Sequence, residues 1–282
     1  MKNIGIFIKR GVPEALDVVK DLLLCLKEKR LKSFVEGEAA SSLGIKGLQG
    51  RLIPTKVDMI VVLGGDGTLL SVARLVGNRS VPILGVNLGG LGFITEISKD
   101  EVCGSINNIL SGRYSFEERI MLIADVYRNG KKLKQHNALN DIVLHKSALA
   151  RMIELDIHIN NKYVTTFKAD GLIVSTPTGS TAYSLSAGGP ILYPTLESFL
   201  MTPICPHTLT SRPIVLPDAF TLDISIKKGD NIYLTLDGQE GLPLKVNDKV
   251  RIKKADYKTR FLHLHDRDYF KVLRTKLNWG KR

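Results

Sequence analysis

A single carboxylate lies between glycines directly after an apolar segment of the chain. Residues 58–63 read Asp-Met-Ile-Val-Val-Leu, residues 64–68 read Gly-Gly-Asp-Gly-Thr, and apolar residues then recur at helical spacing over 69–76. Glycines let backbone N–H groups approach a phosphate, and the start of a helix attracts anions. An aspartate there repels phosphate unless it meets a hydroxyl or a metal ion, so Asp66 is a candidate general base or Mg²⁺ contact. The alternative is a turn in which glycine supplies positive φ and Asp66 caps the helix.

Two further polar motifs follow along the chain. Residues 87–93 read Asn-Leu-Gly-Gly-Leu-Gly-Phe and end a predicted strand over 83–86, so both glycine turns are expected at one crevice; a bulge or tight loop is the alternative. Hydroxyl density over 175–186 suits hydrogen bonding to ribose or phosphate, although a segment rich in Ser and Thr is often only a loop. Eight side chains supply it: Ser175, Thr176, Thr178, Ser180, Thr181, Tyr183, Ser184 and Ser186.

Three common site patterns do not fit this sequence. No Lys-Ser or Lys-Thr pair follows the 64–67 glycines, which excludes a Walker A loop, and the dinucleotide fingerprint G-x-G-x-x-G is also missing there. His263 and His265 are predicted on one strand face, but a metal site needs more ligands than two and none stands nearby in sequence.

The charge of the chain is concentrated near its C-terminus. The formal charge is +12, and residues 245–282 hold 13 Lys and Arg against 4 Asp and Glu, which places +9 of the +12 there. We interpret this as a solvated basic face that can attract anionic nucleotides, not as a nucleic-acid surface. No apolar run approaches the roughly 20 residues of a membrane helix, and the first residues lack a signal-peptide pattern, so a cytoplasmic location is expected.

The first part of the chain alternates predicted strands and helices. Strands are expected over 3–9, 58–63 and 83–86, and helices over 12–26, 69–76 and 98–110, the last opened by a capping box of Ser98 and Glu101. A Gly- and Ser-rich loop is expected over 37–50. Strand-helix alternation favours a parallel, Rossmann-like sheet covered by helices, so residues 1–115 are predicted to form an α/β domain that carries the Gly-Gly-Asp-Gly loop.

The pattern changes near residue 116. Apolar and polar residues alternate strictly over 151–160, 222–226 and 232–236, and Asn129-Gly130 and Asn160-Asn161 have the composition of hairpin turns. Residues 116–255 are therefore predicted to form an all-β, dinucleotide-binding domain, an antiparallel β-sandwich. Residues 256–282 are predicted to be a basic C-terminal tail that returns to the N-terminal domain.

Taken together and in this order, the motifs resemble the NAD kinase family. The resemblance is carried by 64–68, 87–93, 140–141, 170–190, 206–213, 237–239 and 269–279, and it covers nearly the whole chain. Gly-Gly-Asp-Gly alone is shared with lipid kinases and phosphofructokinases, whereas residues 176–189 are the specific part. The resemblance implies transfer of the terminal phosphoryl group of ATP to the 2′-hydroxyl of the adenosine ribose of NAD, which makes NADP, with Mg²⁺ or another divalent cation.

The resemblance also implies roles for individual residues. Asp66 matches the catalytic base, with Gly67 beside it at the nucleotide, and Asn140 and Asp141 match a pair that binds the ribose hydroxyls of NAD. The dinucleotide site of the family is shared between neighbouring subunits, which implies a homodimer or homotetramer. Further NAD contacts are implied at Arg151, Lys168, Asp170, Thr181, Ala182, Tyr183, Ser184, Leu185, Ser186 and Gln239.

Three positions depart from the family pattern. Asp141 is commonly Glu, Arg151 is often His, and Lys168 is often Arg, and a lysine does not make the bidentate contact of an arginine. These departures bear on affinity and on the choice between NAD and NADH more than on the reaction. The alternatives are a lipid or sugar-phosphate kinase that shares Gly-Gly-Asp-Gly, and a regulator that binds NAD without catalysis; neither a membrane nor a nucleic acid is expected as a partner.

Overall fold

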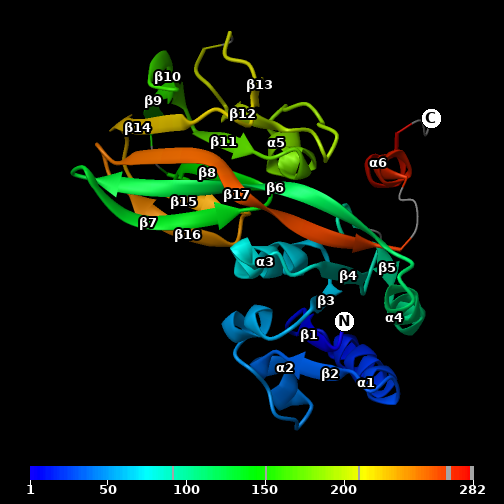
Figure 1. Cartoon of the computed structure of the whole chain (residues 1–282). Helices are drawn as coiled ribbons and strands as arrows, with labels where there is room; N and C mark the ends of the chain where they lie inside the picture. Colours follow the sequence, from blue (N-terminus) through cyan, green and yellow to red (C-terminus); the bar gives the residue numbers. More distant parts are fainter. Residues whose placement is uncertain (91, 150, 209, 265–267, 280–282) are drawn as a thin grey trace. The chain divides into compact units, whose positions relative to one another are not determined.

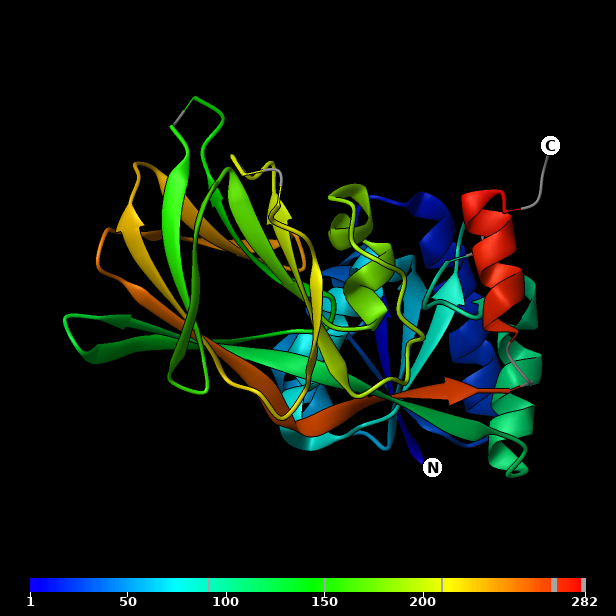
Figure 2. The ribbon, with the colours of Figure 1, turned by 90° about the horizontal axis from the view of Figure 1, so that it is seen from above.

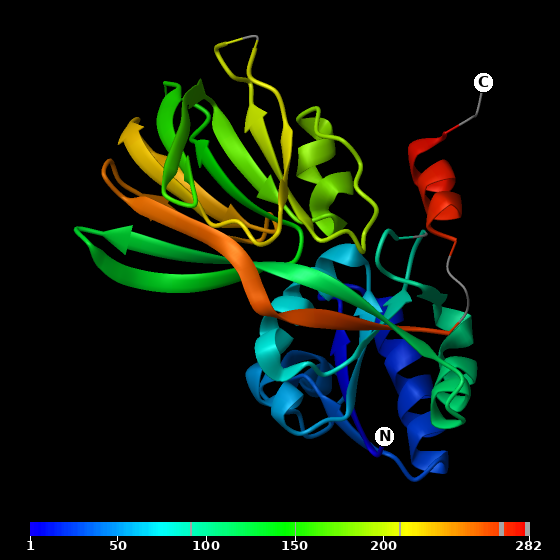
Figure 3. The ribbon, with the colours of Figure 1, turned by 45° about the horizontal axis from the view of Figure 1, so that its top comes forward.

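The chain forms two compact units. The computed structural model describes all residues except 91, 150, 209, 265–267 and 280–282. Met1–Glu118 and Thr259–Arg282 together form the first, called the α/β unit, and Arg119–Lys258 form the second, called the β unit. Both junctions fall inside long strands, β6 (Ser115–Arg128) and β17 (Lys249–His263), so the chain passes between the units without a linker (Figure 3).

A parallel sheet is the frame of the α/β unit. Its order is β17-β4-β3-β1-β2, with β5 beside β4, and each of these pairings is parallel. Every residue of β3 is buried, which explains its unbroken apolar run, because an inner parallel strand is covered on both faces. Besides the end of β17, the strands are β1 (Asn3–Ile8), β2 (Lys32–Val35), β3 (Met59–Gly64), β4 (Ile83–Asn87) and β5 (Ile97–Ser98) (Figure 1).

Helices cover both faces of this sheet. Side chains alternate along β3, so Val61 and Leu63 point to the same face of the sheet. On that face they share an apolar core with Leu22 and Leu26 of the helix α1 (Pro13–Glu28). The opposite face meets α3 (Asp66–Val76), where Leu69 lies close to Gly85 of β4. Helix α1 also contacts α4 (Val102–Leu110) (Figure 2). The remaining helical segments are α2 (Gly37–Ser42), the 3-10 turns η1 (Gly50–Thr55), η2 (Gly77–Arg79) and η3 (Lys99–Glu101), and α6 (Tyr269–Leu277).

Two predictions from local sequence in the α/β unit have different outcomes. The predicted capping box is confirmed, because the backbone N–H of Ser98 donates to Glu101 Oε2 at 2.8 Å where η3 leads into α4. The predicted loop over 37–50 is wrong in part, since α2 occupies its first six residues and buries Ala39 and Ala40. A helix that short depends on tertiary packing rather than on its own propensity.

The β unit consists of two antiparallel sheets. One has the order β13-β12-β11-β8-β15-β16, and the other has β10-β9-β14-β17, with β6 beside β17 and β7 beside β6 (Figure 1). Two short helical segments, η4 (Thr178–Thr181) and α5 (Tyr183–Ser186), follow β11. The strands not yet defined are β7 (Lys131–Ala138), β8 (Asp141–Lys146), β9 (Ile153–Ile159), β10 (Lys162–Ala169), β11 (Gly171–Ser175), β12 (Ser198–Ile204), β13 (Ile214–Pro217), β14 (Leu222–Lys228), β15 (Ile232–Leu236) and β16 (Glu240–Leu244).

The predicted antiparallel sandwich is confirmed by the packing between these sheets. A single apolar core joins Leu155 and Ile157 of β9 to Leu144 of β8 and Leu234 of β15. Alternate residues of β9 are buried, as its sequence pattern predicted. Both predicted hairpin turns are also present, because Asn129-Gly130 and Asn160-Asn161 adopt positive φ, with φ values between 50° and 75°.

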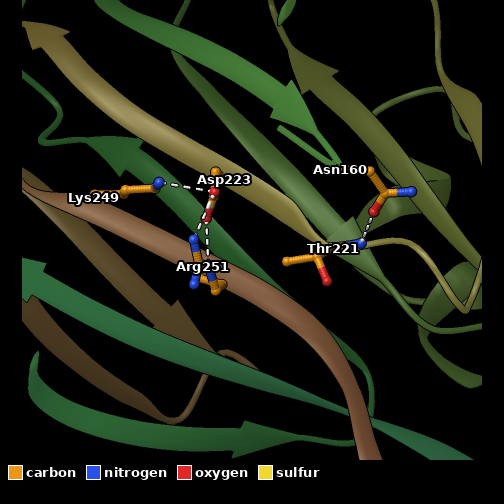
Figure 4. A network of polar contacts seen from close by, with 5 residues as sticks. All are labelled: Asn160, Thr221, Asp223, Lys249 and Arg251. Atoms are coloured by element: carbon orange, nitrogen blue, oxygen red, sulfur yellow. Dashed lines mark hydrogen bonds and ion pairs between the residues drawn. The ribbon is translucent and has the colours of Figure 1, made fainter. Parts of the chain in front are cut away.

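Acidic residues from elsewhere in the chain pair with the basic side chains of β17. In the β unit, Asp223 is only 4% exposed and accepts two hydrogen bonds from Arg251, at 2.8 and 3.0 Å, while Lys249 lies 2.8 Å from it (Figure 4). Lys254 pairs with Asp218 and Lys258 with Glu197. Much of the positive charge near the C-terminus is thus compensated within the fold.

Candidate active site

Asp66 is the first residue of α3, where the chain turns from β3 into the helix. Gly65 occupies the capping position with an extended backbone, and no side chain caps this helix. The interpretation of Asp66 as a helix cap is therefore wrong. Its half-buried side chain instead reaches the segment that follows the second glycine turn.

Three consecutive backbone amides hold the Asp66 carboxylate. Phe93 N–H donates to Oδ2 at 2.7 Å, and the N–H groups of Ile94 and Thr95 both donate to Oδ1 at 3.1 Å. The Thr95 hydroxyl adds a longer bond to Oδ1 at 3.3 Å. A Cβ on Gly92 would overlap the Asp66 carboxylate, so this approach requires glycine. Leu91, part of the same motif, lies outside the described residues.

The sheet brings the two glycine turns to one edge. Gly64 at the end of β3 is in register with Asn87 at the end of β4, and Leu88 N–H donates to the Gly64 carbonyl at 3.3 Å. Carboxyl ends of parallel strands are the usual ligand-binding edge of an open α/β sheet. Asp66 is therefore held at that edge, with its carboxylate oriented by the amides of residues 93–95.

A cavity of about 240 Å³ lies at the same edge, beside the loop that joins β1 to α1. Lys9 N–H donates to the Leu63 carbonyl at 2.8 Å, so this loop runs next to the end of β3. Arg10 lines the cavity and pairs with Glu38 at 2.8 Å and with Glu36 at 3.8 Å. The α/β unit thus offers glycine-turn amides, one oriented carboxylate and a cavity along a single sheet edge.

A second cavity, of about 360 Å³, lies in the β unit. It brings together four residues that the sequence predicted as NAD contacts, namely Asn140, Asp141, Ala182 and Tyr183. Gly238, which precedes the predicted contact Gln239, also lines it. The other lining residues are Val143, His145, Thr235 and Asp237.

Two side chains of this cavity have unusual polar surroundings. Asn140 Oδ1 is buried and accepts no hydrogen bond from the described residues, which is costly for a polar atom unless a ligand supplies a donor. Asp141 is 4% exposed, and burial, followed by the nearby charge of Asp237, raises its pKa to about 7. An unsatisfied acceptor beside a carboxyl that titrates near neutrality is suited to binding sugar hydroxyls.

Asp237 organises the turn that carries these two side chains. Its carboxylate accepts hydrogen bonds from the backbone N–H groups of Leu139, Asn140 and Asp141, at 3.2, 2.7 and 3.2 Å. The Asp237 N–H in turn donates to the Asp141 carbonyl at 3.0 Å. No role of its own was predicted for Asp237 from the sequence, although residues 237–239 carry part of the family resemblance.

Part of the hydroxyl-rich segment is buried within the fold. Five of its eight hydroxyl residues are buried, namely Ser175, Thr176, Thr178, Ser180 and Ser184. Thr176 Oγ1 donates to the Leu139 carbonyl at 2.6 Å, and Ser175 Oγ donates to the Asn140 carbonyl at 3.1 Å. Ser175 and Thr176 therefore support the turn at residues 139–141, and contact of the segment with a ligand stays a prediction.

The other predicted NAD contacts lie outside this cavity, all but Gly67 in the β unit. Arg151 and Lys168 are exposed, and Asp170 lies 3.7 Å from Lys146; none of the three lines the 360 Å³ cavity. Thr181, Leu185, Ser186 and Gln239 are half-buried or exposed, whereas the Ser184 hydroxyl shares a hydrogen bond of 2.9 Å with Thr202. Gly67 is exposed at the start of α3.

The described residues contain no group of three or more His, Cys, Asp or Glu side chains placed to hold a metal ion. His263 is instead flanked by two glutamates, and His265 lies outside the described residues. Mg²⁺ commonly binds through substrate phosphates with one or two protein carboxylates, so the single oriented carboxylate of Asp66 fits a metal that arrives with a nucleotide.

Comparisons with known proteins decide among the kinase alternatives. A family model described as the ATP-NAD kinase N-terminal domain matches residues 4–114, and one described as the ATP-NAD kinase C-terminal domain matches residues 139–264. The chain belongs to the NAD kinase family. It is 50% identical to the NAD kinase of Geobacter metallireducens over 283 residues and to that of Geobacter sulfurreducens over 286 residues, with complete coverage of each chain.

Solved structures agree with this assignment. Yeast NADH kinase complexed with NADH superposes with a TM-score of 0.93 at 28% identity, covering 100% of this chain and 89% of that one. An NAD kinase from Archaeoglobus fulgidus in complex with ATP shares the fold, with a TM-score of 0.77 at 23% identity over 99% of both chains. The chain is thus an NAD-phosphorylating kinase of the ATP-dependent family, and the lipid-kinase and regulator alternatives are not supported. Among the described helices, none is long and apolar enough to cross a membrane.

Proposed function

We propose that Asp66 is the catalytic base of this NAD kinase. In this role its carboxylate accepts the proton of the adenosine 2′-hydroxyl as that oxygen bonds to the terminal phosphorus of ATP. The observation that carries the proposal is the set of three amide bonds from residues 93–95, which orient the carboxylate at the ligand-binding edge of the sheet. General-base assistance is typically worth about 10²–10⁴-fold in rate.

The β unit supplies the proposed dinucleotide contacts. Asn140 Oδ1 lacks a donor among the described residues, and Asp141 lies beside it in the same cavity, so both are suited to bind ribose hydroxyls. Ala182 and Tyr183 contribute to the cavity wall. We assign the remaining family-implied contacts, Arg151, Lys168, Asp170, Thr181, Ser184, Leu185, Ser186 and Gln239, to the same dinucleotide as proposals.

Phosphoryl transfer depends mainly on positioning and on neutralising charge. Glycine-turn amides next to Asp66 are suited to hold phosphate oxygens of the donor. A divalent cation such as Mg²⁺, bound with ATP, supplies charge compensation on the triphosphate. Asp66 is the described carboxylate best placed to approach that cation.

We also propose a homodimer or homotetramer in the cytoplasm. Edge strand β10 exposes Tyr163 and Val164, and edge strand β13 exposes Ile214 and Val215. Unpaired apolar strand edges favour pairing with a second copy. Light scattering on the purified protein tests the assembly, and a monomer at micromolar concentration would contradict it.

The base assignment is tested with Asp66→Asn, which keeps the size of the side chain but removes its basicity. The expected result is a loss of kcat of about 10²-fold or more with NAD affinity, measured by calorimetry, within a few-fold of wild type. Asp58→Asn is a matched control, because Asp58 also accepts a backbone amide, that of Asn3 at 2.9 Å, at the other end of β3. Wild-type turnover in Asp66→Asn refutes the proposal.

A further inference from the structure

A buried histidine lies between two glutamates in the α/β unit. His263, near the end of β17, is 5% exposed. Its Nδ1 contacts Glu96 Oε2, and its Nε2 lies 2.8 Å from Glu117 Oε2. Burial alone would lower the pKa of His263, but the bonds to Glu117 and Glu96 raise it above its ordinary value. An imidazolium, which donates from both nitrogens, matches two carboxylate acceptors.

One of these glutamates directly follows the segment that holds Asp66. Residues 93–95 donate the three amides to the Asp66 carboxylate, and Glu96 is the next residue. The Glu96 side chain is bonded to His263 and accepts the Leu264 N–H at 3.3 Å, while the Glu96 N–H donates to the Gly85 carbonyl at 3.1 Å. Glu96 is therefore fixed from β4 on one side and from the end of β17 on the other.

The 93–95 segment needs such an anchor. It belongs to neither a helix nor a strand, so no regular ladder fixes the directions of its amides. All three must point at one carboxylate, and misplacement of about 1 Å around reacting groups can cost about 10²-fold in rate.

We propose that His263 is a positioning residue that, through Glu96, fixes the amides of residues 93–95 around the Asp66 carboxylate. The proposal rests on the proposed role of Asp66 as the base. It assigns a function in turnover to a side chain that lies 167 residues from Glu96 in sequence. A purely structural histidine would affect the amount of folded protein but not the turnover of the folded fraction.

Two variants test the anchor from its two ends. His263→Gln and Glu96→Gln are expected to lower kcat about 10-fold or more while KM for NAD stays within about twofold, since the dinucleotide contacts proposed in the β unit are untouched. Rates are normalised to the folded fraction measured by thermal unfolding. Glu118→Gln is the control. It breaks an exposed ion pair of 2.9 Å between Glu118 of β6 and Arg260 of β17, the strand that carries His263.

The outcomes separate this proposal from the base assignment. If Asp66→Asn is inactive but His263→Gln and Glu96→Gln retain wild-type kcat, the anchor is overturned and the base stands. A loss of activity that only follows the loss of folded protein, or a parallel change in KM, also overturns it. If His263→Gln does not fold, the result for Glu96→Gln decides. Wild-type kcat in Asp66→Asn would overturn both the base assignment of Asp66 and the anchor role of His263.

Discussion

The carboxylate of Asp237 accepts a hydrogen bond of 2.7 Å from the backbone N–H of Asn140, across 97 residues of sequence. Two further amides, of Leu139 and Asp141, donate to the same carboxylate. This arrangement fixes the backbone of the proposed ribose contacts from the end of the neighbouring strand β15. Asp237 is thereby placed to act on NAD binding without needing to touch the dinucleotide.

Asp237→Asn is expected to raise KM for NAD by about 10–100-fold, because hydrogen bonds to a charged acceptor are worth about 1.5–3 kcal/mol and 1.4 kcal/mol is a factor of ten. The neutral side chain also turns one N–H donor toward backbone donors. Steady-state kinetics and calorimetry with NAD measure the effect. Asp156→Asn, which removes a carboxylate bonded to the Thr166 hydroxyl in the same unit, serves as the control. Equal NAD affinity in the two variants would contradict this prediction.

The raised pKa of Asp141 makes the free energy of unfolding depend on pH. Burial, followed by the charge of Asp237, raises its pKa from 3.8 to about 7. Between these values the folded state keeps a proton that the unfolded state has lost, so the free energy of unfolding falls as pH rises through this window and levels off above it. The contribution is on the order of 2–4 kcal/mol.

Urea unfolding at several pH values between about 4 and 8 measures this effect. Asp141→Asn is expected to remove the Asp141 part of the slope, leaving a flatter dependence than in wild type. Asp17→Asn, at an exposed position of α1, controls for the loss of one carboxylate. The same slope in wild type and Asp141→Asn would show that Asp141 titrates normally.

Buried hydroxyls beneath the 139–141 turn give a third prediction. Thr176 Oγ1 donates to the Leu139 carbonyl at 2.6 Å and accepts the Gly179 N–H at 3.2 Å. Thr176→Val keeps the shape of the side chain but removes its hydroxyl. The Leu139 carbonyl and the Gly179 N–H both lose a hydrogen-bond partner, so a loss of about 1–3 kcal/mol in unfolding free energy is expected. The half-buried Thr181, with one bond of 3.4 Å, is the matched control as Thr181→Val. Urea unfolding compares them, and equal stabilities would contradict the prediction.

Much of the fold could be predicted from local patterns. The apolar run over 58–63, the strict alternation over 151–160 and the Asn-Gly turn at 129–130 each reflect one strand or turn and its immediate surroundings. The helix α2 was missed because its six residues, Gly-Glu-Ala-Ala-Ser-Ser, carry no clear helical period. Elements whose residue pattern reflects their own conformation were therefore predictable from the sequence, whereas an element that depends on tertiary packing was not.

The candidate site was less accessible to sequence reasoning. Asp66 could be identified because a carboxylate among glycines has few structural uses at a strand end. For the hydroxyl segment, density along the chain does not say which oxygens face inward, and five of its eight hydroxyl residues are buried. Asp237 and His263 act through partners 97 and 167 residues away, and no local spacing encodes such contacts.

The ion-pair network on β17 yields the last prediction. Asp223 is 4% exposed, and although burial raises its pKa, the hydrogen bonds from Arg251 and Lys249 hold that pKa below its ordinary value (Figure 4). Asp223→Asn leaves the bidentate Arg251 without its charge partner, so a loss of about 1–3 kcal/mol is expected, less than for a fully buried pair because Arg251 is partly exposed. Lowering the pH through the folded pKa of Asp223 should remove the same contribution in wild type. A double-mutant cycle of Asp223→Asn with Arg251→Met, read by urea unfolding, isolates the coupling; additive effects of the two substitutions would show that the two side chains are not energetically coupled.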